Sequence, residues 1–142
     1  MARQTLQTLI RLNRFEVDEK RRALAALLDQ EAEMQGRIRR IDADLKAEQE
    51  AFASADIQQL GAAFGPYAAA AKERKAAVLE ELADLYPQIE QARADLADAF
   101  AELKKYEIAE ANRAADEAAE EARAEGLELD EMGLAAYRRG EG

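Results

Sequence analysis

Residues 6–52 read LQTLIRLNRFEVDEKRRALAALLDQEAEMQGRIRRIDADLKAEQEAF, and this stretch decides the fold. Apolar side chains recur in it at positions a and d of a heptad in which Ile10 is assigned to a. The a positions hold Ile10, Val17, Leu24, Glu31, Ile38, Leu45 and Phe52, and the d positions hold Leu6, Asn13, Lys20, Leu27, Met34, Ile41 and Glu48. Ten of these fourteen residues are apolar. At about 1.5 Å of rise per residue, the repeat predicts a helix of roughly 70 Å that supercoils left-handedly with a partner helix.

A second heptad repeat supplies a partner helix. Its a positions hold Ala68, Lys75, Leu82, Ile89, Leu96 and Leu103, and its d positions hold Ala71, Val78, Leu85, Ala92, Ala99 and Tyr106. Between the two repeats, capping residues and the pair Gly65 and Pro66 predict a reversal near Asp56, with a short extra turn of helix at 57–63 as an option. If the chain folds back there, opposed residues of the antiparallel pair have numbers that sum to about 118.

Two further features shape the second helix. Pro87 falls at the outward position f and predicts a kink rather than a break, with a turn at this residue as the alternative. Beyond Tyr106 the seam positions turn polar, so residues 113–125 are expected to project as a single acidic helix. Gly126 and Gly133 would then weaken the tail.

The predicted fold class is therefore all-α, a two-helix antiparallel coiled-coil hairpin whose second helix overhangs the first. Residues 1–142 form a single domain. Helix one is expected at about 5–53, the tip at 54–65, helix two at about 66–125 and a weakly ordered tail at 126–142.

The composition excludes much chemistry. The chain has no Cys and no His, so a thiolate nucleophile, an imidazole base and a Cys/His zinc site are impossible. It lacks a glycine-rich phosphate loop, and Asp42 and Asp44 lie inside the heptads without the glycine turn of a calcium loop. The sequence therefore predicts a protein that is not an enzyme and that binds no cofactor or metal.

The charge pattern bears on partners. The net charge is −10, and residues 107–131 hold ten acids against Arg113 and Arg123. This stretch is expected to repel nucleic acid and to favour a basic protein surface, or to be a solvated helix face. The small basic cluster at 37–40 has acids beside it and no interleaved aromatics, which argues against nucleic-acid binding. No apolar run is long enough for a membrane span, and we expect a cytoplasmic protein.

Some apolar residues lie off the seam. Leu9, Leu12 and Phe15 make the start of helix one apolar nearly all round, which is typical of a helix that contacts more than one partner. Those contacts could come from the second helix or the tail, or from another protein. Three aromatic residues gather at the tip, where they pack the loop or meet a partner: Phe52, Phe64 and Tyr67.

Three segments carry a resemblance to a known family. They are LQTLIRLNRFEVDEKRRAL at 6–24, FAELKKYE at 100–107 and LDEM at 129–132. With them the chain resembles the FliJ family of flagellar type III export, in length and layout as well. The resemblance implies an antiparallel coiled coil similar to the central stalk of rotary ATPases. Such a protein inserts its terminal end into the hexameric export ATPase, contacts the export gate in the membrane and handles substrate chaperones.

The resemblance also implies where partners would bind. The ATPase-facing end would comprise Leu9, Arg11, Leu12, Arg14, Phe15, Arg21 and Arg22. The gate-facing candidates are the tip residues Phe52, Phe64 and Tyr67. The location would be the cytoplasmic side of the inner membrane, at the flagellar base. The heptads alone support an alternative, a cytoplasmic coiled-coil adaptor or scaffold that associates with itself.

Overall fold

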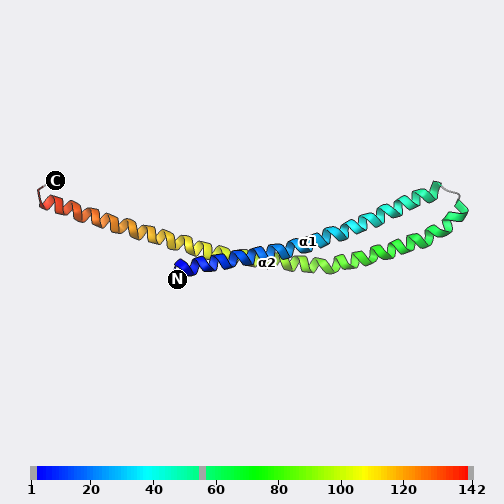
Figure 1. The fold of residues 1–142 in the computed structure, drawn as a ribbon, viewed down its shortest axis with the longest axis horizontal. Coiled ribbons are helices and arrows are strands. Elements are labelled where there is room, and N and C mark those ends of the chain that lie inside the picture. The colour runs from blue at the N-terminus through cyan, green and yellow to red at the C-terminus, as the bar shows by residue number, and fades with distance from the viewer. Residues whose placement is uncertain (1–2, 55–56, 141–142) are drawn as a thin grey trace. The chain divides into compact units, whose positions relative to one another are not determined.

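The computed structural model describes residues 3–54 and 57–140. Every element within these ranges is helical: α1 spans Arg3–Ser54 and α2 spans Ile57–Arg138 (Figure 1). The all-α hairpin predicted from the heptads is confirmed. The expected reversal at Asp56 lies outside the described residues.

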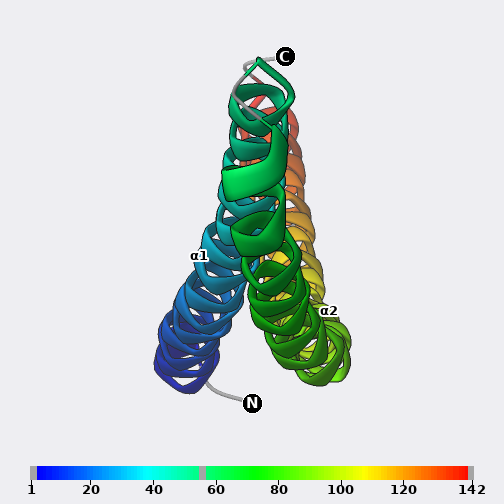
Figure 2. The ribbon, with the colours of Figure 1, turned by 90° about the vertical axis from the view of Figure 1, so that its right-hand side faces the viewer.

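The chain packs as two units. The tip unit is Asp18–Asp98, and the terminal unit combines Met1–Val17 with Ala99–Gly142. In the tip unit α1 and α2 run antiparallel and side by side (cyan and green in Figures 1 and 2). Its core is formed by Leu82, Leu85 and Ile89, against which α1 packs Leu24, Leu27, Leu28, Met34 and Ile38.

The predicted heptads account for the burial of both helices. All twelve seam positions of α2 are buried or half-buried. On α1 the same holds for every seam position except Glu48, which is exposed. The register agrees as well, because Lys75 Nζ lies 2.9 Å from a carboxylate oxygen of Asp42 and the two numbers sum to 117.

The start of α2 differs from the sequence-based expectation. The helix begins at Ile57 rather than at Pro66, and both Pro66 and Pro87 lie inside it, so there is no turn at either proline. Both proline rings are exposed, which keeps them clear of α1. Phe64 and Tyr67 are half-buried on either side of Pro66, and this packing offsets the backbone hydrogen bond that a proline removes.

The end of α2 also differs, because the helix runs to Arg138 rather than to about residue 125. Gly126 and Gly133 cost helix stability without interrupting it, since each is flanked by good helix formers. Gly140 has a positive φ of 76°, a conformation that favours glycine, and its amide donates to the Tyr137 carbonyl at 3.0 Å. This glycine turn follows the last helical residue, Arg138, and ends the helix.

The terminal unit contains a short paired stretch and a long single one. Leu6 and Val17 of α1 are buried, as are Ala99 and Leu103 of α2. From residue 114 to 135 every side chain of α2 is exposed, as the polar seam positions predicted (yellow to red in Figure 1). None of the described helices combines the length and apolarity needed to cross a membrane.

Candidate functional site

The strongest candidate for a docking surface lies near the start of α1. Thr8, Arg11, Leu12 and Phe15 share one helix face, since they are three or four residues apart, and they line a shallow depression. We call these four residues the N-terminal patch. Leu12 is 61% exposed and Phe15 is 58% exposed, so the described part of the chain leaves both side chains open to solvent.

Two arginines bring positive charge to the N-terminal patch, Arg11 within it and Arg14 beside it. Arg11 also lines a neighbouring depression together with Arg14, Gln7 and Ile10. Within the described residues neither arginine has an ion pair, and both are exposed. An apolar surface with unpaired arginines beside it is a suitable binding site for a partner that carries apolar and acidic side chains.

The remaining ATPase-facing candidates are placed differently. Leu9 is half-buried and is not part of the exposed face. Arg21 and Arg22 belong to the tip unit, where their guanidinium groups lie 3.8 Å from Asp18 and 3.1 Å from Glu19. Their charges are therefore partly matched by neighbours on the same helix.

The tip aromatics contact each other across the two helices. The ring centroids of Phe52 and Phe64 are 5.2 Å apart and the planes are inclined by 57°, a favourable tilted geometry. Tyr67 is half-buried one turn further along α2. Packing therefore accounts for much of this aromatic surface, and a gate-facing role stays a prediction.

A charged cluster that the sequence-based expectations did not include lies at the end of the paired stretch. Arg113 donates two hydrogen bonds to Glu110, at 2.9 and 2.8 Å, and one to Glu117 at 2.5 Å. These hydrogen bonds lower the pKa of the Glu110 carboxyl and raise the pKa of Arg113. We call these three residues the Arg113 clasp. Its spacing of three and four residues is a signal that could have revealed it.

The clasp lies beside the beginning of α1. Arg113 and Leu6 line the same cavity, together with Tyr106 and Asn112. Leu6 is only 5% exposed, although it stands in the first turn of its helix. The clasp and Leu6 therefore mark where the two-helix seam ends.

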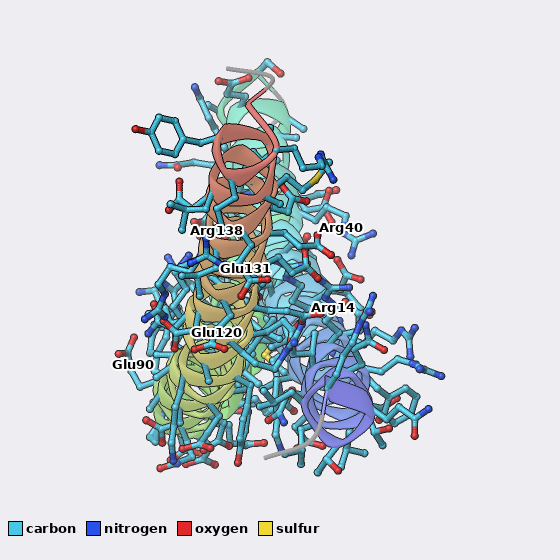
Figure 3. All side chains as sticks on the ribbon, turned by 90° about the vertical axis from the view of Figure 1, so that its left-hand side faces the viewer. Arg14, Arg40, Glu90, Glu120, Glu131 and Arg138 are labelled. Atoms are coloured by element: carbon cyan, nitrogen blue, oxygen red, sulfur yellow. The ribbon has the colours of Figure 1, made fainter. Side chains whose placement is uncertain are left out.

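Beyond Arg113, residues 114–138 form what we call the acidic extension, which includes Glu117 of the clasp. It holds eight Asp and Glu residues against Arg123 and Arg138. Figure 3 shows side chains projecting around this part of α2, with Glu120, Glu131 and Arg138 labelled. Five large apolar residues of the extension are 56–78% exposed: Leu127, Leu129, Met132, Leu134 and Tyr137. Within the described ranges no group of acidic residues could hold a metal ion.

Comparisons with known proteins add one match. The family model described as "Flagellar FliJ protein" matches residues 2–142. No curated protein matches the chain. No solved structure matches it either.

Proposed function

Because the chain belongs to the FliJ family of flagellar proteins, we propose that it serves flagellar protein export as a stalk for the hexameric export ATPase. The family consists of non-catalytic components of the flagellar export apparatus, and this chain is a component of that apparatus. A role without catalysis is part of the proposal. Binding to the ATPase is the step that we add.

One observation carries the proposal. The N-terminal patch exposes Leu12 and Phe15 beside the unpaired charges of Arg11 and Arg14. Two large apolar side chains next to each other on a helix face are costly to leave in water, and aromatic and arginine side chains dominate the energetics of protein interfaces. The patch therefore docks in the ATPase ring and promotes assembly of the hexamer.

The family also supports further partners for the rod. We propose that the chain links the ATPase to the export gate in the membrane and interacts with substrate chaperones, at the cytoplasmic side of the flagellar base. Phe52, Phe64 and Tyr67 at the tip are the candidates for the gate contact. The acidic extension disfavours nucleic acid as a partner, because it repels phosphate groups.

The test compares two double variants of the full chain in binding and hydrolysis assays with the flagellar export ATPase of the same organism. Leu12→Ser/Phe15→Ser removes the exposed apolar part of the patch. Leu79→Ser/Tyr86→Ser is the matched control, because it also removes one aliphatic and one aromatic side chain, each 47% exposed on α2. Circular dichroism verifies that both variants keep their helix content.

We expect the patch variant to bind the ATPase at least about tenfold more weakly, and to lose the stimulation of hydrolysis and ring formation. The control should bind like the unmodified chain. If both double variants bind the ATPase equally well, the N-terminal patch is not the contact. If the unmodified chain has no effect on hydrolysis or ring formation at high micromolar concentration, the stalk function itself is wrong.

A further inference from the structure

A groove on the tip unit combines arginines with an apolar floor. Its lining residues come from both helices and are Arg37, Arg40, Ile41, Asp44, Arg74, Ala77 and Val78. We call it the arginine groove. Val78 is 9% exposed and Ile41 is half-buried, so the floor is the outer edge of the two-helix seam.

The groove has more positive charge than its surroundings neutralise. Arg37 donates to Glu33 on its own helix at 2.8 Å, whereas Arg40 and Arg74 have no ion pair within the described residues. Asp42, which could have matched them, is paired with Lys75 instead. Asp44 is the one acid of the lining, against three arginines.

This combination specifies the kind of ligand that fits. A groove between two parallel or antiparallel helices accepts a third helix, because ridges of side chains on the third helix pack between the other two. The apolar floor requires a helix with exposed apolar residues, and the unpaired guanidinium groups require carboxylates next to them. An acidic amphipathic helix meets both requirements.

The chain itself provides an acidic helix with exposed apolar residues, of which Leu127, Leu134 and Tyr137 share one side. In the acidic extension, Glu117 pairs with Arg113 and Glu120 with Arg123. Six other carboxylates have no ion pair within the described residues, and they belong to Asp116, Glu121, Glu125, Glu128, Asp130 and Glu131. The exposed apolar residues of the extension, from Leu127 to Tyr137, lie among these acids.

The groove and the extension of one chain do not pair with each other. Both Arg74 and the extension belong to α2, which is one uninterrupted helix from Ile57 to Arg138. A segment of a continuous helix cannot turn back and lie beside an earlier segment of the same helix. The extension that occupies a groove must therefore come from another molecule.

We propose that the arginine groove binds the acidic extension of a second copy of this chain. Two copies that exchange extensions reciprocally form a symmetric dimer, in which the same pair of surfaces meets twice. The net charge of −10 opposes association at long range. At physiological ionic strength this repulsion is screened beyond about 8 Å, whereas the local pairing of carboxylates and guanidinium groups persists.

The first experiment measures the mass of the purified full chain by sedimentation equilibrium at about 0.15 M salt, where the Debye length is about 8 Å. Arg40→Glu/Arg74→Glu reverses two charges of the groove. Arg39→Glu/Arg93→Glu is the matched control, because it makes the same charge change on the same two helices with residues that do not line the groove. The Arg39 guanidinium instead lies near Gly36 on its own helix, 3.8 Å from the position that a Cβ atom on Gly36 would occupy.

We expect a dimer that the groove variant weakens at least about tenfold, whereas the control variant leaves it intact. The proposal is wrong if the unmodified chain stays monomeric at about 100 µM, or if both variants weaken the dimer equally. A third outcome is that the unmodified chain is monomeric and binds another acidic protein, and that the groove variant loses this binding. The groove would then have a different occupant, and the proposal that a second copy binds it would be wrong.

A mixing experiment then tests the pairing itself. Glu128→Lys/Glu131→Lys reverses two charges of the extension and leaves the groove intact. Each variant alone should be monomeric, and an equimolar mixture with Arg40→Glu/Arg74→Glu should restore the dimer, since both contacts then join opposite charges. A mixture that stays monomeric contradicts the pairing. These measurements use the isolated chain, so they do not depend on whether the stalk proposal holds.

Discussion

Two stretches of the same helix differ in what stabilises them. Residues 71–103 of α2 bury a side chain at nearly every turn, and the buried residues are Ala71, Val78, Leu82, Leu85, Ile89, Ala92, Ala99 and Leu103. Residues 114–135 are helical as well, yet they bury none. The first stretch is held by packing on α1. The second depends on helix propensity and on local side-chain pairs.

The difference explains how a long unpaired helix can exist. Starting a helix costs more than extending one, so an isolated helix without packing is marginal in water. The acidic extension begins where a packed helix has already formed, and it therefore avoids the cost of starting. We infer that it unravels from its C-terminal end, while the packed stretch unfolds cooperatively with α1.

The largest expected effect comes from removing a packed side chain. Leu85 is 2% exposed in the core cluster of the tip unit. Leu85→Ala should lower the free energy of unfolding by about 2–3 kcal/mol, the lower part of the usual range, because its half-buried neighbours can partly fill the cavity. Chemical denaturation followed by circular dichroism measures it.

The matched control is the same substitution in the acidic extension. Leu129 is 67% exposed, so Leu129→Ala should change the free energy of unfolding by no more than about 0.5 kcal/mol. Equal losses at the two positions would mean that the extension is packed against something in solution.

A smaller effect separates global from local stability. Replacing glycine with alanine inside a helix gains about 0.5–1 kcal/mol. At Gly36 an added methyl group meets only the Arg39 guanidinium at 3.8 Å, and at Gly126 it meets nothing within 4 Å, so both substitutions fit. Gly36→Ala should raise the midpoint of cooperative unfolding. Gly126→Ala should leave that midpoint unchanged and slow amide hydrogen exchange in the extension. A shift of the cooperative midpoint by Gly126→Ala would show that the extension unfolds together with the hairpin.

The sequence predicted the features that depend on packing between the two helices. The heptads identified the buried positions of both helices, because burial in a two-helix coiled coil follows the seven-residue repeat. They also predicted a register in which opposed numbers sum to about 118, and the structure agrees with it at Asp42 and Lys75. They also predicted that Leu12 and Phe15 lie off the seam, where the structure leaves them exposed.

The sequence predicted less where local and tertiary effects compete. Gly65 and Pro66 are turn residues by propensity, yet half-buried aromatic neighbours hold a helix across them. The Arg113 clasp was not predicted, because the net charge of an acidic stretch does not show which of its residues are three or four positions apart and can form ion pairs. The expectation that Arg21 and Arg22 face the ATPase came from the family resemblance. The spacing of three residues from Asp18 to Arg21 and from Glu19 to Arg22 is a signal in the sequence that their charges are partly matched.

A still smaller effect is expected from the ion pair between the two helices. The Lys75 and Asp42 side chains are 37% and 50% exposed, so solvent screens their attraction. A double-mutant cycle with Lys75→Met and Asp42→Asn should give a coupling of at most about 0.5 kcal/mol in global unfolding. The same cycle on Glu120 and Arg123, which pair within the extension, should give none, because that segment unfolds separately. Equal coupling for both pairs would contradict the separation of the two stretches.

The smallest effect concerns the Arg113 clasp, which lies where the two stretches of α2 meet. Hydrogen bonds from Arg113 hold the pKa of Glu110 below its ordinary value of 4.5. A carboxyl whose pKa is lowered by folding stabilises the folded state above its ordinary pKa, and this contribution is lost as the pH falls through the lowered value. The clasp should therefore stabilise α2 at the end of the seam at neutral pH, and this local contribution should be lost in acid.

An NMR titration of the Glu110 carboxyl tests the clasp. Arg113→Gln should raise the pKa of Glu110 towards its ordinary value, because the charged donor of both hydrogen bonds is gone. Arg123→Gln removes the same charge from the extension and should leave the pKa of Glu110 unchanged, since Arg123 pairs with Glu120. If both variants shift the pKa of Glu110 equally, the net charge of the extension is the cause, and the hydrogen bonds from Arg113 do not specifically lower this pKa.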